Sequence, residues 1–485
     1  MTWFEQLSSL DATFLHLENR AAHMHVGAMA IFEGPPPSYV DLFALIESRL
    51  EHVPRYRQRL AFVPLGQGRP VWVDDGEFDL GYHVRHTALP APGGEEQLKR
   101  LAGRLLSQQL DRDKPLWELW FVEGLGDGRF AVISKTHHCM VDGISGVDIA
   151  AVLMDGEPRF EPPPPPKSAW TPRPVPSGAE LLAHSVRAKL ERNPWHFLRD
   201  VGEAGSDARR IVAEIAGGIA PLVGLAQMGN APASSLNQLI GPHRRFETVG
   251  FALAEIKKVR AALGGTVNDV ILAVVTGALR QLLLARGERL SSDLRVMVPV
   301  SVRSAEARGA LGNQVAAVFC PLPVGEPDPA ARLARVVREM RGLKESKQAV
   351  GAMALTRLGE FTPWTILAQA ARLQTRTRFF NLVVTNVPGP QFPLYLLGRK
   401  LSACYPVVPL AAMQTIGIAL LSYDGSIGVG LVGDADRARD LPVLAAAMPE
   451  ALAELVAAAA PPETTAPSEC SPRSSRPSSS AGSIC

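Results

Sequence analysis

The feature that most constrains this chain is an apolar run that ends in two histidines and leads into a second apolar run. Phe130–Thr136 predicts a strand, the segment HHCMVDG follows at 137–143, and Gly143–Leu153 predicts a helix. Neighbouring side chains on a strand face opposite sides. His137 and His138 therefore cannot both face one cleft if the strand continues through them. We expect one histidine to carry chemistry and the other to pack.

Three interpretations of this segment compete. In the first, the histidines belong to the core and Asp142 caps a helix, with Gly143 supplying the backbone freedom to leave the strand. In the second, the segment binds a metal, but adjacent strand residues chelate poorly and no Cys or Glu cluster lies nearby. In the third, a neutral imidazole takes a proton from a hydroxyl group near neutral pH. The residues alone disfavour a metal and leave the other two interpretations open.

Composition narrows the class of protein. Lys plus Arg is 50 and Asp plus Glu is 48, giving a net charge of +2, which does not favour a nucleic-acid partner. The five cysteines are scattered without a CxxC pair, which favours a reducing compartment. The N-terminus lacks the basic and apolar regions of a signal peptide. The longest strongly apolar helical candidate is Ile215–Met228. It is shorter than the roughly 20 residues that a membrane-spanning helix needs. We therefore expect a cytoplasmic protein that is soluble or peripherally membrane-bound.

Two breaks in composition divide the chain. Residues Glu157–Ser177 contain nine prolines, which favour an extended linker. Residues Pro461–Cys485 contain eight serines and five prolines and predict a disordered tail. The sequence pattern outside these two segments predicts an α/β (α+β) protein with two halves joined by a long helical crossover. The predicted units are an N-terminal half at 1–156, a linker and crossover at 157–244, a C-terminal half at 245–460, and the tail at 461–485.

Hydrophobic periodicity places the remaining elements. Val267–Arg286 is apolar on nearly all faces and should be a buried helix. The other predicted helices are Tyr39–Leu50, Glu95–Leu110, Ala179–Leu198, Asp207–Met228, Asp328–Lys347 and Leu441–Ala459. The other predicted strands are Gly27–Phe32, Val71–Val73, Leu119–Val122, Leu294–Val302, Gln314–Leu322, Asn381–Thr385, and a hairpin of Gln414–Tyr423 with Ser426–Val432.

With HHxxxDG at the end of a strand, the sequence resembles the CoA-dependent acyltransferase superfamily. More narrowly, it resembles the bacterial wax ester synthase/diacylglycerol acyltransferases, over roughly residues 1–455. The ordered set of segments is more specific than HHxxxDG alone. The further matching segments are Ser9-Leu10-Asp11 with Phe14, Pro115-Leu116-Trp117-Glu118, Ile240–Arg245, Asn268-Asp269, Pro299–Arg303, Gly312-Asn313 and Asn386–Pro390.

The resemblance implies a fold and a reaction. The fold would be two chloramphenicol-acetyltransferase-like halves with a central tunnel, and His138 would lie near its middle. The reaction would esterify diacylglycerol, a long-chain fatty alcohol or both, giving triacylglycerol or wax ester. Acyl-CoA would be the co-substrate and no other cofactor is implied. A lipid product implies association with a membrane or a lipid-droplet surface.

The resemblance also assigns roles around the motif. His138 would be the general base of a direct transfer, so Cys139 need not be a nucleophile and fits a small buried side chain better. His137 would be structural. Asp142 would turn away and pair with an arginine, for which Arg303 is our candidate, although Arg303 also fits a solvated strand end.

Roles in the second half and the channel are implied with alternatives. The oxyanion needs a donor, for which Asn268 is the first candidate and Ser301 the second. Asp269 fits either active-site support or a capping box with Thr266. The segment Pro115, Leu116 and Trp117 would line the substrate channel, and Trp117 fits a packing anchor equally well.

Two rival functions remain at this point. One is an amide-forming condensation on carrier-bound substrates, which shares HHxxxDG but is disfavoured by the free-standing chain. The other is a catalytically inactive lipid-binding or droplet-surface protein, which is disfavoured by the intact histidine and aspartate. The preferred acceptor, the acyl length and the oligomeric state do not follow from the sequence.

Overall fold

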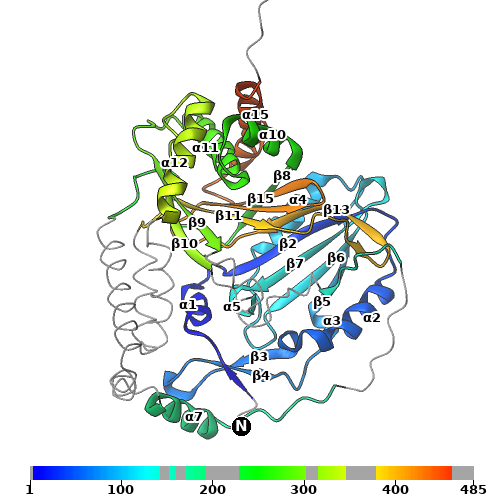
Figure 1. Ribbon diagram of the computed structural model, residues 1–485. Coiled ribbons are helices and arrows are strands. Elements are labelled where there is room, and N and C mark those ends of the chain that lie inside the picture. The colour runs from blue at the N-terminus through cyan, green and yellow to red at the C-terminus, as the bar shows by residue number, and fades with distance from the viewer. Residues whose placement is uncertain are drawn as a thin grey trace, which may run out of the picture.

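The computed structural model describes residues 4–141, 152–159, 170–191, 229–301, 315–345 and 378–460. The described part is a mixed α/β protein built on two six-stranded sheets, called here the first and the second sheet, and one three-stranded small sheet. The two larger sheets lie one above the other in Figure 1. This arrangement agrees with the predicted α/β class.

The first sheet carries the histidine motif at the end of β7 (Phe130–His137). Its strand order is β12-β13-β2-β7-β6-β5, and β7 pairs antiparallel with both of its neighbours. Every residue of β7 is buried, as an apolar run in the middle of a covered sheet requires. The other strands are β2 (His25–Phe32), β5 (Val84–Ala88), β6 (Trp117–Glu123), β12 (Tyr395–Leu396) and β13 (Arg399–Val407).

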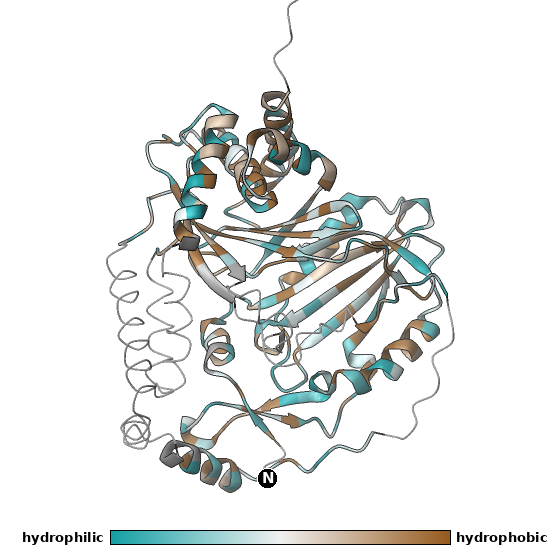
Figure 2. Ribbon diagram, in the orientation of Figure 1, coloured by the Kyte–Doolittle hydropathy of each residue, from teal (hydrophilic) through white to brown (hydrophobic). Residues whose placement is uncertain are grey.

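The second sheet has the order β10-β9-β11-β14-β15-β8, and four helices cover the face turned away from the first sheet (Figure 1). The helices are α10 (Leu253–Leu263), α11 (Val267–Ala285), α12 (Pro329–Glu345) and α15 (Leu441–Ala458). Figure 2 shows hydrophobic residues along the strands of both sheets and on these helices. The strands are β8 (Arg244–Ala252), β9 (Leu294–Ser301), β10 (Val315–Leu322), β11 (Leu382–Pro388), β14 (Ile416–Tyr423) and β15 (Ser426–Asp434).

The two large sheets are joined by close backbone contacts. β13 comes from the C-terminal part of the chain, yet it pairs with β2 and completes the first sheet. The same strand lies against β15 of the second sheet, where Gly428 and Gly430 stand over the carbonyl oxygens of Cys404 and Pro406. A Cβ atom on these glycines would lie 2.0 and 1.9 Å from those oxygens. Only glycine permits this approach.

A small sheet and several helices complete the N-terminal part. The small sheet has the order β1-β4-β3, and α7 lies beside it at the bottom of Figure 1. Its strands are β1 (Glu5–Gln6), β3 (Gln58–Ala61) and β4 (Val71–Asp74). The helices are α1 (Ser9–Leu17), α2 (Tyr39–Arg49), α3 (Leu80–His83), α4 (Glu95–Leu106), α5 (His138–Val141) and α7 (Gly178–Glu191), with short 3-10 turns at Leu50–His52, Pro54–Arg57, Pro64–Gly66 and Gly126–Gly128.

Most elements predicted from periodicity are present, and the differences are local. The hairpin turn at Asp424-Gly425 is confirmed, with φ angles of 42° and 77° at its two residues. β11 continues past Thr385 to Pro388, because it pairs in parallel with β14 over its whole length. α4 ends at Leu106 rather than Leu110, where Ser107 takes over the last helical hydrogen bonds. The predicted helical segments at 143–151, 192–198 and 207–228 lie outside the described residues.

Among the described residues, two helices pass a length and apolarity test for crossing a membrane. They are α11 and α15, of 19 and 18 residues. Our selection of Ile215–Met228 as the longest apolar candidate was therefore wrong, since Val267–Ala285 is longer. α11 is 72% buried inside the protein over its apolar window, and it packs against α15 in the core of the second sheet. A buried core helix passes the same test.

We expect removal of residues 461–485 to leave the melting temperature and kcat nearly unchanged. The last described helix, α15, already buries its apolar face in the core through residues such as Leu444, Met448 and Leu455. The Ser/Pro composition of the tail gives it no comparable face. Thermal unfolding and steady-state kinetics of the truncated chain test this. A clear fall in either quantity would mean that the tail docks on the protein.

Candidate active site

The two histidines lie on different elements because the strand ends between them. His137 is the last residue of β7 and His138 is the first residue of α5. The N–H of His137 donates to Leu116 at 2.9 Å, and the N–H of His138 donates to Met24 at 2.7 Å. The strand therefore does not continue through both residues, and the condition for their alternation is not met. The two histidines still differ in exposure: His137 is 1% exposed, whereas His138 is partly exposed.

His137 is held by two contacts that determine its tautomer. The backbone N–H of Cys139 donates to Nδ1 of His137 at 3.1 Å, so Nδ1 carries no proton. The proton therefore lies on Nε2, which is 3.6 Å from Oε2 of Glu18. This separation is longer than an ordinary hydrogen bond but short enough for a charge interaction. The ring thus bridges the buried carboxylate to the first turn of α5, which supports the structural role expected for His137.

Glu18 is the negative centre of this cluster. Its carboxylate is 2% exposed, accepts from Nε of Arg112 at 2.9 Å, and lies 3.6 Å from Nε2 of His25. Burial alone would raise the pKa of Glu18, but the neighbouring His137, His25 and Arg112 together bring it well below its usual range. Burial lowers the pKa of His25 to about 3, so this imidazole is neutral. The cluster therefore combines one carboxylate, one guanidinium, the neutral imidazole of His25 and the ring of His137.

His138 is covered by the N-terminal helix. The ring of Phe14 on α1 stacks on the ring of His138, with 3.8 Å between centroids and 22° between planes. The Nδ1 atom of His138 is buried and finds no hydrogen-bond partner among the described residues. Burial disfavours the charged imidazolium and lowers the pKa of His138 to about 4. The imidazole is therefore in its neutral, proton-accepting form throughout the physiological range.

We expect the pH profile of kcat/KM to lose activity on the acid side near pH 4, rather than near the usual histidine value of 6.5. The sign follows from the lowered pKa of His138: the neutral base persists above about 4 and is protonated below it. Initial rates across this range, with circular dichroism to confirm folding, test the expectation. An acid limb centred between about 6 and 7 would contradict it.

Cys139 follows His138 and is buried. Its side chain is 2% exposed in a cluster with Leu7, Ala12 and Leu116. Burial raises the pKa of the Cys139 thiol well above its usual value, so the thiol stays protonated. A protonated, enclosed thiol is a poor nucleophile, which agrees with the expected packing role.

The segment predicted to line the channel lies directly beside the motif. Leu116 accepts the hydrogen bond from His137 and is fully buried. Trp117 is 1% exposed, donates from Nε1 to Tyr56 at 2.8 Å, and stacks on His83 at 4.6 Å. These contacts fit the alternative in which Trp117 anchors the core. A channel role for Pro115, Leu116 and Trp117 stays a prediction.

A second group of motif residues meets at the start of α11. Nδ2 of Asn386, at the end of β11, donates to Oδ1 of Asn268 at 3.1 Å. Asp269 forms the predicted capping box, since Thr266 N–H donates to its carboxylate at 2.8 Å and Asp269 N–H donates to Oγ1 of Thr266 at 3.2 Å. The helix cap therefore accounts for Asp269, and Asn268 is the polar side chain left at this turn for chemistry.

The remaining predicted residues are only partly described. Ser301 is the last residue of β9 and its Cα pairs with Val315. Asp142, Gly143 and Arg303 lie outside the described residues. Within the described residues, no group of three or more His, Cys, Asp or Glu side chains could hold a metal ion.

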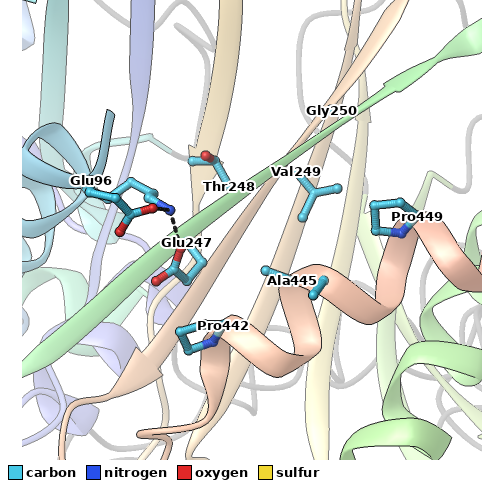
Figure 3. A pocket seen from close by; sticks show the side chains of 10 residues that line it. Glu96, Glu247, Thr248, Val249, Gly250, Pro442, Ala445 and Pro449 are labelled. Atoms are coloured by element: carbon cyan, nitrogen blue, oxygen red, sulfur yellow. Dashed lines mark hydrogen bonds and ion pairs between the residues drawn. The ribbon is translucent and has the colours of Figure 1, made fainter. Parts of the chain in front are cut away.

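A cavity of about 480 Å³ lies elsewhere, where α4 meets β8 and α15 (Figure 3). Its polar end carries Lys99, whose Nζ is 2.6 Å from Glu247 and also pairs with Glu96. Its apolar end is formed by Val249 and by residues of α15 such as Pro442. The salt bridge joins α4 of the N-terminal part to β8 of the second sheet, so this region contributes to the attachment of the two parts.

Sequence reasoning missed Glu18, His25 and Arg112. A local signal for Glu18 existed: Asp11, Phe14 and Glu18 lie at helical spacing, so α1 and its first following residue present them on one side. Phe14 and Glu18 do both meet the histidine motif. The contribution of Arg112 had no local signal, because its guanidinium meets Glu18 only through the tertiary packing that places α1 against α5.

The fold and the site together define a two-lobed acyltransferase with HHxxxDG at a strand end. Residues 7–271 match the wax ester synthase/diacylglycerol acyltransferase catalytic domain, and residues 311–456 match the WS/DGAT C-terminal domain. The chain therefore belongs to the wax ester synthase/diacylglycerol acyltransferase family.

Individual relatives agree with this assignment. A probable diacylglycerol O-acyltransferase of Mycobacterium tuberculosis is 35% identical over 457 residues, covering 93% of this chain and 96% of the relative. The solved wax ester synthase/diacylglycerol acyltransferase from Marinobacter aquaeolei VT8 is 29% identical with a TM-score of 0.65, covering 94% of this chain and all of that one. The first condensation domain of the CDA synthetase shares the fold at 19% identity, with a TM-score of 0.55 and coverage of 94% and 97%.

Proposed function

We propose that this chain transfers an acyl group from acyl-CoA to the hydroxyl group of diacylglycerol, a long-chain fatty alcohol or both. The observation that carries the proposal is the neutral, partly exposed His138 directly after β7, held beside the buried His137, whose Nε2 faces the carboxylate of Glu18. Family membership supports the same reaction. No cofactor beyond the acyl-CoA co-substrate is proposed.

In the proposed mechanism His138 accepts the proton of the acceptor hydroxyl. The oxygen attacks the thioester carbonyl, a tetrahedral oxyanion forms, and its collapse breaks the carbon–sulfur bond. The imidazolium then returns the proton to the departing CoA thiolate. The low pKa of His138 favours this return, because the protonated ring is a stronger acid than an ordinary imidazolium. The protonated thiol of Cys139 supports direct transfer without an acyl-enzyme.

The oxyanion needs a donor, and Asn268 remains our first candidate, with Ser301 as the second. The hydrogen bond from Asn386 to Oδ1 of Asn268 supports this choice. When its oxygen accepts from Asn386, the amide of Asn268 is oriented with its own NH₂ group free to donate elsewhere. Asn386 would then be a positioning residue for this donor.

Residues Asp142 and Arg303 are proposed to pair and to hold the loop that follows His138. Arginine suits this role because its planar fork grips a carboxylate with two hydrogen bonds. We expect Asp142→Ala to lower both stability and activity, and Arg303→Ala to add little on that background. A double-mutant cycle on the free energy of unfolding measures the coupling. Strictly additive losses, with a coupling below about 0.5 kcal/mol, would mean that Asp142 has another partner.

The protein is further proposed to associate peripherally with a cytoplasmic membrane or lipid-droplet surface, where both acceptor classes are found. High salt or carbonate should release such a protein from isolated membranes. Recovery by detergent alone would contradict peripheral attachment.

The function is tested with purified protein, palmitoyl-CoA, and parallel incubations with diacylglycerol, hexadecanol and no acceptor. Ester formation with either acceptor, together with release of free CoA, is the expected result. A carrier-bound amine acceptor tests the condensation rival, and amide formation there without ester formation would favour it. No turnover of labelled acyl-CoA with any acceptor would favour an inactive lipid-binding protein.

A further inference from the structure

The imidazole of His138 lies against the ring of Phe14, and its backbone is held separately. The N–H of His138 donates to the carbonyl oxygen of Met24 at 2.7 Å, which holds the main chain. The two rings stack with 3.8 Å between centroids and 22° between planes. Nδ1 of His138 is buried without a hydrogen-bond partner among the described residues. The contact with Phe14 therefore constrains the plane of the imidazole.

A histidine that acts as a general base needs a constraint of this kind. The torsion between Cβ and the ring has broad minima, so an imidazole turns easily about this bond. A base must also lie within hydrogen-bond reach of the hydroxyl group that it deprotonates, and a small misplacement is costly to the rate. An aromatic face packed nearly parallel to the imidazole restricts the torsion and leaves the ring edge, which carries the nitrogen atoms, free to meet a substrate.

The stacking ring is itself held in place, because α1 packs against α5 (Figure 1). Leu15 of α1 is buried in the same cluster as Cys139 of α5. Phe14 packs against the cluster that contains Met24, whose carbonyl oxygen holds the backbone of the motif. At the end of α1 the N–H of Glu18 donates to the carbonyl oxygen of Phe14 at 3.0 Å. The position of the aromatic ring is thus determined by an anchored helix.

The covered position also affects the charge state of His138. Burial is the largest cause that lowers the pKa of His138 to about 4; its own backbone opposes the shift, and the charge of His137 adds to it. The face of an aromatic ring attracts cations, which alone would favour the imidazolium. Because the pKa is lowered overall, the loss of water outweighs this attraction. The apolar cover and the aromatic face therefore have different effects, which substitutions can separate.

Other titratable groups stand near the motif, and all of them stay in place when Phe14 is replaced. On α5 the neighbour is Cys139, and Asp142 lies outside the described residues. The groups on the surrounding elements are Asp11 and His16 of α1, Glu18 after it, His137 of β7, His25 of β2, and Arg55 and Arg112 beside these carboxylates. A change in the titration of His138 in a Phe14 variant would therefore follow from the lost ring.

We propose that Phe14 is a positioning residue for the proposed general base: its ring orients the imidazole of His138 and keeps water from one face of it. The proposal rests on the proposed function, in which His138 takes the proton of the acceptor hydroxyl. Phe14 acts through His138 and needs no contact with either substrate.

Two substitutions in the full chain separate orientation from cover. Phe14→Leu keeps an apolar cover without a planar face, so kcat should fall about tenfold or more while the acid limb of kcat/KM stays near pH 4. Phe14→Ala also admits water, so its acid limb should move up toward the ordinary histidine value of about 6.5. Phe14→Tyr keeps the planar face and should retain the wild-type kcat. The KM for palmitoyl-CoA should change little in all three variants.

Phe43→Ala is the matched control for a lost aromatic side chain. Phe43 lies on α2, is partly buried against the N-terminal core, and has its ring centroid 6.0 Å from that of Tyr39. This control should lower the melting temperature and leave kcat and the acid limb as they are in the wild type. Circular dichroism and thermal unfolding of each preparation show that it is folded, and Phe14→Leu carries the test if Phe14→Ala does not fold.

Chemical modification measures the state of His138 without turnover. Diethyl pyrocarbonate acylates the unprotonated imidazole, so modification slows as the ring becomes protonated. Peptide mass spectrometry with fragmentation separates the His138 product from that of His137, and His138→Ala supplies the background. The wild-type rate should stay level down to about pH 5, because the pKa of His138 is about 4. In Phe14→Ala the rate should fall with a midpoint nearer 6.5.

The outcomes separate the role of Phe14 from the reaction itself. The role of Phe14 is overturned if Phe14→Leu keeps kcat within about threefold of the wild type, or if Phe14→Tyr loses as much as Phe14→Leu does. An acid limb and a modification profile that do not move in Phe14→Ala also overturn it. Absence of ester formation by the wild type with every acceptor overturns the proposed function instead, and the modification profiles then still decide whether Phe14 shields the imidazole.

Discussion

His138→Ala is expected to lower ester formation by about 10²–10⁴-fold, because it removes the proposed general base. The fold should survive. The ring packs mainly on Phe14, and its backbone N–H bond to Met24 is kept in alanine. Loss of the stacked ring should cost about 0.5–1.5 kcal/mol of stability. The measurement is initial-rate transfer from palmitoyl-CoA, with circular dichroism and thermal unfolding of the same preparation.

His52→Ala is the matched control for this variant. His52 is exposed, lies in the 3-10 turn after α2, and its Nε2 atom is 3.9 Å from the carboxylate of its neighbour Glu51. Its removal should change neither rate nor stability. If His138→Ala kept turnover within about threefold of the wild type while folded, His138 would not be the base.

Glu18→Ala is expected to destabilise the protein by about 3 kcal/mol, the lower end for breaking a buried charge pair. Arg112 would lose its carboxylate, but its side chain is 41% exposed and can be rehydrated, which moderates the loss. Activity should fall as well, because Nε2–H of His137 loses its partner and the ring no longer holds the first turn of α5. Denaturant unfolding and kcat measure the two effects.

Glu18→Gln removes the charge and keeps most of the side-chain volume. Its stability should lie between that of the wild type and that of Glu18→Ala. Glu51→Gln, at a 57% exposed position, is the control and should be neutral. The lowered pKa of Glu18 also sets a pH dependence: its stabilisation is present above the ordinary carboxyl value of about 4.3 and is lost as pH falls below it. The difference in the free energy of unfolding between the wild type and Glu18→Ala should therefore become smaller at acid pH. A gap below about 0.5 kcal/mol at neutral pH would contradict the structural role of Glu18.

Local sequence patterns were sufficient to predict an element where its own hydrophobic periodicity and its neighbours in the sequence stabilise it. β7 and α11 were predicted because each contains a long apolar run, and the turn at Asp424-Gly425 because its residues tolerate positive φ. The capping box of Thr266 with Asp269 is equally local. The change from strand to helix between His137 and His138 was not predicted. The apolar pattern does not show where a strand ends and a helix begins inside a polar motif.

Pairings between distant segments had no such signal. No strand was predicted over β13, which lies in the predicted second half of the chain but completes the first sheet because β2 has an open edge there. Glu18 and Arg112 are ordinary charges in the sequence, and their contact depends on how α1 packs against α5.

The sequence by itself determined the class of protein, the base candidate and the ordered set of motifs, because these depend on residue type and short spacing. The tertiary structure alone decided the division between the two histidines. A buried carboxylate and a backbone N–H fix the tautomer of His137, whereas burial lowers the pKa of His138. The physical reason is that charge compensation and desolvation are properties of the packed surroundings, which segments far apart in the chain supply together.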